Sequence, residues 1–209
     1  MTKKAYHHGN LREAILKSAC EILDQSGVEG LSLRKVAQQT GVSATALYSH
    51  FRDKRELLAV LATGGFEQLT ASMEQQAKKG DAGPAPDLTG LARGYVLFAV
   101  DNRALFQLMF GREIGDLLEF PQLVAAGSKS YEMMATCVAD ATGETSMPNR
   151  ASMAATAAWS MVHGLSMLII DGRISAQDYG VKSNSELVNQ VCSMLNFNTG
   201  NCDTDSIDG

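Results

Sequence analysis

Residues 33–52, LRKVAQQTGVSATALYSHFR, combine two short helical patterns with a tight turn, and this arrangement can present side chains to DNA. Val36 faces inward from the first pattern, Leu47 from the second, and Gly41 permits a left-handed backbone at the turn. The second helix would then expose, where base edges are met in a major groove, Ala44, Thr45, Tyr48 and Ser49. The alternative is an ordinary pair of packed helices in a bundle, and spacing alone leaves both open.

The residues in and around this segment carry a more specific pattern. It reads GLSLRKVA over residues 30–37 and GVSxxALYxHFxxKxxLL over residues 41–58. The pattern closely resembles the TetR family of transcription regulators, without a gap from about Leu11 to Leu61. The resemblance implies an amino-terminal helix-turn-helix domain, an all-α regulatory domain, a homodimer, and release of double-stranded operator DNA when a small effector binds.

Carried over residue by residue, the resemblance implies a set of DNA-contacting positions: Arg34, Ser43, Ala44, Thr45, Tyr48, His50 and Lys54. Ala44 and Thr45 would meet base edges, where a methyl can touch the thymine methyl group. Tyr48, His50 and Lys54 would contact phosphates, which position the protein without reading sequence. The alternatives are a half-core role for Tyr48, a helix-capping role for His50 and a solvated charge for Lys54. The small recognition residues suggest that specificity also depends on Arg34 and on DNA shape.

A second set of residues, rich in methionine and aromatic side chains, follows in the carboxy-terminal half. Such a set suits an adaptable apolar pocket for a small effector, and it equally suits an ordinary core. The candidate effector-binding residues are Tyr95, Phe98, Phe106, Met109, Phe110, Met133, Trp159 and His163. The stretch WSMVHG at residues 159–164 resembles a Trp-x-x-x-His-Gly signature of one TetR subgroup. His163 would orient a ligand or would be a buried imidazole bonded to a carbonyl.

Residue patterns for other chemistry are missing from the sequence. It shows no nucleophile with a base and an orienting group, no phosphate-binding loop and no quartet of metal ligands, so we expect no enzyme activity, no cofactor and no metal. The adjacent His7 and His8 would point apart on a helix, and a basic arm touching phosphates or a plain disordered start are the alternatives for them. The four cysteines form no CxxC pair, and three read as small core residues.

Capping residues divide the first 80 residues into four predicted helices. Asn10, Ser32, Ser43 and Asp53 are natural N-caps, and Gly27 is a natural stop for the first helix. Residues 79–86 read as a loop. Further helical patterns follow near residues 87–100, 102–111, 121–141, 149–171 and 184–196. No alternating strand pattern occurs, so the sequence predicts an all-α fold with a three-helix head on a long fourth helix, which Gly64 and Gly65 would weaken.

These elements suggest three parts of the chain. Residues 1–61 would form the DNA-binding domain, residues 62–197 the effector-binding and dimerisation domain, and residues 198–209 a disordered tail. The Ala-rich pattern at 149–170 lies beside a clean apolar stripe, Leu187, Val188, Val191, Cys192 and Leu195. In the family such a final pair joins two subunits. The alternative is packing of both helices within one chain.

Charge and composition agree with this organisation. Of 209 residues, 45% are apolar and 20% charged, ordinary values for a soluble protein. Residues 1–60 carry a balance of +3 and residues 61–209 a balance of −8, so the basic head is the part that would meet a polyanion. We find no apolar run of ~18 residues and no signal peptide, and therefore expect a cytoplasmic protein that contacts no membrane. The leading hypothesis is an effector-released repressor; an activator or a helical interaction module without DNA binding are the alternatives.

Overall fold

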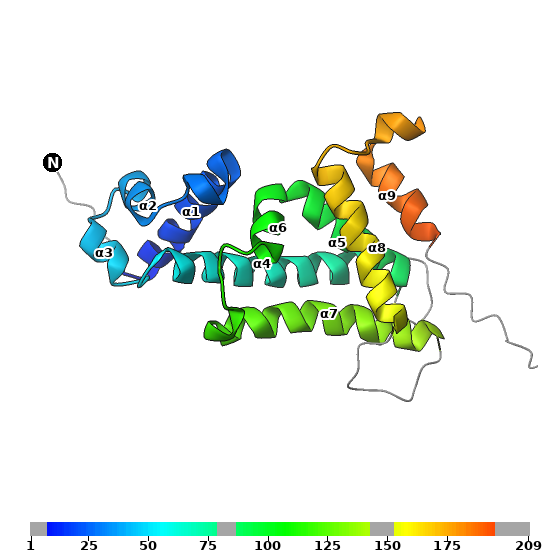
Figure 1. The fold of residues 1–209 in the computed structure, drawn as a ribbon, viewed down its shortest axis with the longest axis horizontal. Coiled ribbons are helices and arrows are strands. Elements are labelled where there is room, and N and C mark those ends of the chain that lie inside the picture. Colours follow the sequence, from blue (N-terminus) through cyan, green and yellow to red (C-terminus); the bar gives the residue numbers. More distant parts are fainter. Residues whose placement is uncertain (1–7, 79–86, 143–152, 195–209) are drawn as a thin grey trace, which may run out of the picture. The chain divides into compact units, whose positions relative to one another are not determined.

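The part of the chain that the structure describes consists of helices and the turns that join them. The computed structural model describes residues 8–78, 87–142 and 153–194, and within these ranges there are helices, turns and no strand (Figure 1). The all-α prediction is therefore confirmed. In chain order the elements are α1 (His8–Gly30), α2 (Leu33–Thr40), α3 (Ala44–Tyr48), α4 (Lys54–Ala77), α5 (Leu88–Asp101), α6 (Arg103–Phe110), the 3₁₀ turn η1 (Leu117–Glu119), α7 (Pro121–Thr142), α8 (Met153–Ile170), the 3₁₀ turn η2 (Ala176–Tyr179) and α9 (Asn184–Ser193).

The predicted helix boundaries agree closely with these elements. Gly27 was expected to end the first helix, and its backbone is non-helical, with φ 64° and ψ −176°, so the regular helix is interrupted there. The range of α1 includes the short helical segment that follows this kink, up to Gly30. The positive φ is inexpensive for a glycine. The turns η1 and η2 have no counterpart in the sequence prediction.

The chain divides into two compact units. Unit 1 comprises residues up to Ala71 together with Phe98–Ser130, and unit 2 comprises Ser72–Leu97 together with Tyr131 onward. Unit 1 therefore contains the helices of the head, most of α4, α6, η1 and the first part of α7. The division into a DNA-binding and a regulatory domain at residue 61 stays a prediction.

The core of unit 1 lies between the head helices and the first half of α4. Figure 1 shows α1, α2 and α3 gathered around the first turns of α4. Their apolar faces supply side chains that are essentially inaccessible to solvent, among them Ile15, Ile22, Leu31, Val36, Leu47, Phe51, Leu57 and Leu58. α1 also packs against α6. The head is thus held by burial of apolar surface from four helices, which fixes the orientation of the short helix α3.

Helix α4 passes through Gly64 and Gly65 without interruption, so the two glycines do not break it. A Cβ atom on Gly65 would lie 2.6 Å from the Met109 sulfur and 3.2 Å from a Leu105 methyl, whereas one on Gly64 would meet nothing within 4 Å. Gly65 therefore allows α4 and α6 to approach closely. Gly64 has no such steric role.

In unit 2, α5 crosses the last turns of α4 at very short range. A Cβ atom on Gly94 would lie 2.6 Å from the Met73 Cα atom, and one on Gly90 2.7 Å from the Ala77 Cα atom. The Ser72 hydroxyl donates a hydrogen bond of 2.9 Å to the Gly94 carbonyl. Two glycines one turn apart thus let the helix backbones touch.

Cys137 and Cys192 are buried, as the sequence predicts for core cysteines. Their burial raises the pKa of each thiol to about 11.

The eighteen residues of α8 have a mean hydropathy of 1.5, which by length and composition is enough to cross a membrane. This corrects the expectation that no segment reaches that length. Within unit 2, Ala155, Val162, Leu165 and Ile169 of α8 are buried, as in a core helix. One face stays open, because Met153, Met161 and Leu168 are 91%, 43% and 46% exposed.

The apolar stripe of α9 is buried within the chain itself. Leu187, Val188 and Cys192 are each at most 2% exposed. Val191 of the same stripe is half-buried. The part of this helix in a dimer stays a prediction. Several predictions fall outside the described residues: the arm with His7, the loop at 79–86, Leu195 and the tail at 198–209.

Candidate DNA-binding head and effector site

The turn between α2 and α3 has the geometry that its sequence predicts. Gly41 adopts φ 75° and its N–H closes the end of α2 on the carbonyls of Ala37 and Gln38. The Ser32 hydroxyl accepts from the Lys35 N–H at 3.2 Å and caps α2. The Ser43 hydroxyl accepts from the Ala46 N–H at 3.1 Å and caps α3. Two capped helices joined by a left-handed glycine form a rigid helix-turn-helix.

The outer face of α3 consists of the residues predicted to meet base edges. Ala44, Thr45, Tyr48 and Ser49 are exposed, and Tyr48 keeps 57% of its surface open, which excludes a core role for it. Leu47 is completely buried and anchors the helix from its inner face. A short helix fixed on one side and open on the other is what docking into a major groove requires.

The other predicted DNA contacts surround α3. Arg34 is exposed on α2, and His50 is half-buried just after α3, where its backbone N–H donates to the Leu47 carbonyl at 3.0 Å. Ser43 is engaged as the cap of α3 through its side-chain oxygen, so its hydroxyl hydrogen remains available to an acceptor.

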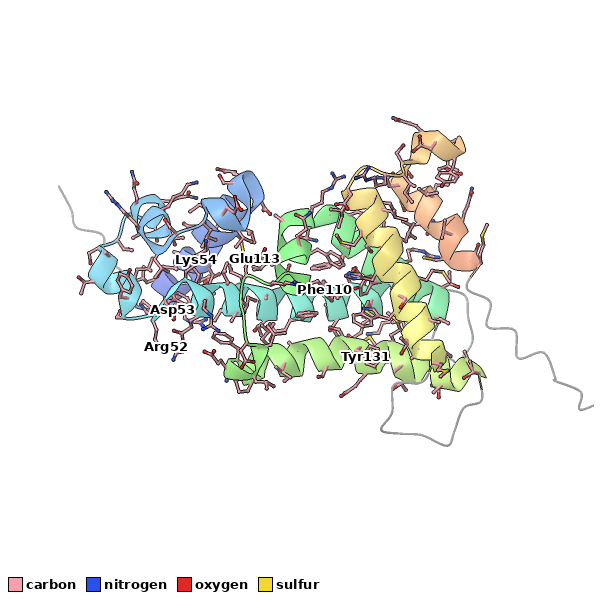
Figure 2. All side chains as sticks on the ribbon, viewed as in Figure 1. Arg52, Asp53, Lys54, Phe110, Glu113 and Tyr131 are labelled. Carbon is pink, nitrogen blue, oxygen red and sulfur yellow. The ribbon has the colours of Figure 1, made fainter. Side chains whose placement is uncertain are left out.

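Lys54 begins α4 and is half-buried. Its ammonium group donates a hydrogen bond of 2.7 Å to the Val28 carbonyl at the end of α1. This differs from a freely solvated charge. An ammonium group has three donors, so the bond to Val28 leaves two for a phosphate. Figure 2 shows Arg52, Asp53 and Lys54 together at the entry to α4.

Sequence reasoning missed Arg55, the next residue. Its guanidinium Nε donates to the Ile114 carbonyl at 2.8 Å, and its Nη2 lies 3.0 Å from a Glu119 carboxylate oxygen. The hydrogen bond to Glu119 is the main reason that the pKa of Arg55 is raised further above its ordinary value. Its partners are about sixty residues away in the chain, and no local pattern in the sequence signals them.

Three of the predicted effector residues form a hydrogen-bonded chain in unit 2. The Trp159 indole N–H donates to the Tyr95 hydroxyl oxygen at 3.3 Å, and the same oxygen lies 3.0 Å from His163 Nδ1. Because an indole nitrogen can only donate, the Tyr95 oxygen accepts there, and the direction of its bond with Nδ1 depends on whether that nitrogen carries a proton. The Tyr131 ring, also from unit 2, meets the Trp159 ring edge-to-face at 5.7 Å between centroids.

Burial shapes the protonation of this chain. It raises the pKa of the Tyr95 hydroxyl well above its ordinary value, and it lowers the pKa of His163. Burial therefore favours the neutral forms of both Tyr95 and His163. Nδ1 of the partly buried imidazole contacts a side-chain hydroxyl, and a role for His163 in orienting a ligand stays a prediction.

The other predicted effector residues are distributed differently. Phe98, Phe106, Met109 and Phe110 belong to unit 1, where Phe106 is fully buried and its ring centroid lies 4.8 Å from that of Phe110. Met133 is half-buried in unit 2. The four residues in unit 1 contribute at least to its apolar core. Their part in binding an effector stays a prediction.

Two adjoining clefts lie between the end of α1 and α6, within unit 1. Their volumes are about 370 and 480 Å³, and both are lined by Gly27, Ala104 and Gln107. Neither cleft is lined by any of the eight predicted effector residues. Among the described residues, no group of three or more histidine, cysteine or acidic side chains is arranged to hold a metal ion.

Comparison with known proteins identifies the family. Residues 15–61 match the bacterial regulatory proteins of the tetR family, and residues 88–190 match the tetracyclin repressor-like carboxy-terminal domain. The chain belongs to the TetR family. The first match contains the whole helix-turn-helix, which is the DNA-binding part of this family of transcriptional regulators, and the two matches together cover more than two thirds of the chain.

Individual relatives resemble this TetR-family chain over different lengths. The tetracycline repressor protein class C of Escherichia coli is 49% identical over 51 residues, which are 24% of this chain and 23% of that protein. The uncharacterised regulator YobS of Bacillus subtilis is 32% identical over 103 residues, or 47% and 51%. The chain thus spans about half, or less, of these relatives. A solved structure from Rhodococcus sp. RHA1, of a protein with unknown function, is 33% identical with a TM-score of 0.75 over 92% of this chain and 97% of that one.

Proposed function

We propose that this protein is a DNA-binding transcriptional repressor that releases its operator when a small, largely apolar effector binds. The observation that carries the proposal is the exposed face of α3, held by a buried Leu47 and a left-handed turn at Gly41. Membership of the TetR family supports it. An activator of the same fold would bind DNA equally well, and the effect of deleting the gene on transcription of the flanking DNA separates the two.

The DNA contacts in this proposal are Arg34, Ser43, Ala44, Thr45, Tyr48, His50 and Lys54. The exposed side chains lie on one turn-linked pair of helices, and the basic residues Arg34 and Lys54 border it. The residues of α3 would read bases, and Tyr48, His50 and Lys54 would fix the register on phosphates. The heads of a dimer would sit about one DNA turn apart, ~34–36 Å.

Two substitutions test this division of roles on the DNA fragment that footprinting defines beside the protein's own gene. Lys54→Ala should weaken binding to specific and random DNA alike, and the salt slope should become shallower by about one unit, since one phosphate contact is lost. Thr45→Ala should instead change the ranking of operator variants, by ~1–3 kcal/mol at an affected base pair. An unchanged ranking for Thr45→Ala would show that α3 does not read bases.

The effector site in this proposal is centred on Tyr95, Trp159 and His163. Met133 of α7 also belongs to the proposed site. The hydroxyl and the imidazole provide hydrogen-bonding groups among aromatic rings, a combination that suits an apolar ligand with one or two polar atoms. Phe98, Phe106, Met109 and Phe110 remain candidates for its apolar part. The Trp-x-x-x-His-Gly subgroup resemblance agrees with this position.

Trp159 makes the effector proposal measurable, because it is the only tryptophan in the chain. An effector should change Trp159 fluorescence and release DNA over the same range of concentration. Trp159→Phe should blunt that release while leaving DNA affinity without ligand nearly unchanged. A variant that loses dimerisation without any loss of effector affinity would contradict a binding role for Trp159.

The dimer in this proposal forms mainly through α8. The helix contains no charged residue, and its open face repeats Met153, Ala157, Met161, Gly164 and Leu168 at helical spacing. A Cβ atom on Gly164 would meet nothing within 4 Å, so a second copy could approach the backbone there. An uncharged helix with a continuous exposed apolar face is typical of an interface between subunits.

A further inference from the structure

The first turn of α4 is fastened to the loop that joins α6 to α7. Arg55 reaches this loop with three parts of its side chain. Nε donates to the Ile114 carbonyl at 2.8 Å, Nη2 pairs with the Glu119 carboxylate at 3.0 Å, and the guanidinium lies 5.6 Å from the centroid of the Phe120 ring. All four residues belong to unit 1. A planar guanidinium with a fixed fork of donors can satisfy such a set of partners at once.

The loop is shaped around the guanidinium. Gly115 adopts φ 79°, a left-handed conformation that favours glycine. A Cβ atom on it would lie 3.3 Å from Arg55 Nη2 and 3.5 Å from Nε. Any other residue at this position would therefore be strained and would crowd the guanidinium.

Lys54, the residue before Arg55, joins the first turn of α4 to a different segment of unit 1. Lys54 is bonded to the Val28 carbonyl at the end of α1, and α1 itself packs against α6. The start of α4, the end of α1, α6 and the loop after α6 therefore form a closed ring of contacts within unit 1. Within this ring, Arg55 links α4 to the loop.

We propose that Arg55 is a positioning residue for DNA binding: it touches no DNA, and it holds the first turn of α4, with Lys54, in the place from which the head engages the operator. The inference rests on the proposed DNA contacts of Lys54 and α3. It adds a residue of different role, because the effect of Arg55 is transmitted through the loop residues Ile114, Glu119 and Phe120.

The ion pair between Arg55 and Glu119 is weak enough to be removed without unfolding the head. The side chains of Arg55 and Glu119 are 40% and 51% exposed. Exposed ion pairs contribute little to stability because water and salt screen them. The head core does not depend on this pair, since Leu47, Leu57 and Leu58 are buried by other contacts. Loss of Arg55 should thus shift the turn rather than unfold the domain.

The experiment measures affinity of the full chain for its footprinted DNA fragment at salt concentrations from about 50 to 200 mM. Arg55→Gln should lower affinity roughly tenfold, a factor that corresponds to about 1.4 kcal/mol, and leave the salt slope unchanged. Lys54→Ala, the matched contact variant, should flatten that slope by about one unit. Arg55→Lys should show most of the loss of Arg55→Gln, because an ammonium group keeps the charge and lacks the fork.

Substitutions on the loop provide the decisive control, since Glu119 carries a negative charge and has no attraction for phosphates. Glu119→Gln should weaken DNA binding, and the double variant with Arg55→Gln should lose little more than Arg55→Gln alone. Gly115→Ala, which changes no charge, should act in the same direction. Thermal unfolding of each variant checks that the head is intact.

Several outcomes would overturn the proposal. A shallower salt slope for Arg55→Gln would make Arg55 a phosphate contact, and full activity of Arg55→Lys would make its charge alone responsible. Additive losses for Arg55→Gln and Glu119→Gln would remove the link between them. If the unsubstituted chain does not bind the fragment, the proposed function fails, which differs from a chain that binds and is indifferent to Arg55.

Discussion

At the scale of single residues, the direction of each hydrogen bond determines what a side chain can do. Trp159 donates to Tyr95, and the Tyr95 hydroxyl can then either donate to an unprotonated Nδ1 of His163 or accept from a protonated one. Burial lowers the pKa of His163 and so favours its neutral form.

The stability of the protein should therefore depend on the protonation of His163. As the pH falls below about 6.5, the unfolded chain binds a proton on this histidine before the folded chain does, so acid favours unfolding. The stabilisation is fully present above that pH and is lost as the pH falls toward the lowered pKa. We expect His163→Gln to have a shallower fall in melting temperature between about pH 7 and pH 5 than the unsubstituted protein.

The difference between the two proteins isolates His163, because the other three histidines are present in both. Tyr95→Phe supplies a further control: it removes the hydroxyl and keeps the imidazole. Parallel melting curves for the unsubstituted protein and His163→Gln over this range would contradict the neutral form assigned to His163.

At the scale of elements, Gly64 and Gly65 have different roles although they are neighbours in the same helix, α4. Gly64→Ala should stabilise the protein by up to ~1 kcal/mol, because alanine favours the helix and its methyl group meets open space. Gly65→Ala should destabilise it by ~1–3 kcal/mol, because its methyl group would displace Met109 and Leu105 of α6. Denaturant unfolding of the two variants measures the contrast, and equal effects would show that α4 and α6 do not approach closely at Gly65.

At the scale of the whole molecule, the open face of α8 should control assembly. Leu168→Asp places a charge on that face and should convert a dimer into a monomer at micromolar concentration, as measured by sedimentation. Operator affinity should fall with it, because two heads then no longer bind as one unit. Val124→Asp is the matched control: Val124 is 39% exposed on α7, against 46% for Leu168, and the dimer should persist. A Leu168→Asp protein that remains dimeric would place the interface elsewhere.

The sequence by itself determined the elements of the head. Ser32, Ser43 and Gly41 act locally, through hydrogen bonds and backbone angles within a few residues, so their positions along the chain were sufficient to predict α2, the turn and α3. The contrast between buried Leu47 and exposed Thr45 followed from helical periodicity for the same reason. At Gly27 the local stop signal also acted, because the backbone there leaves helical angles and a short helical segment follows the kink.

Only the tertiary structure decided contacts between residues far apart in the chain. The link from Arg55 to Glu119, the bond from Lys54 to Val28 and the chain from Trp159 through Tyr95 to His163 join segments separated by 26 to 68 residues. The apolar stripe of α9 was visible in the sequence, but periodicity gives the side of a helix that is buried and not the surface that buries it. Leu187 and Val188 pack within the chain, and the exposed apolar face belongs to α8, because the choice between partners depends on how the helices are assembled.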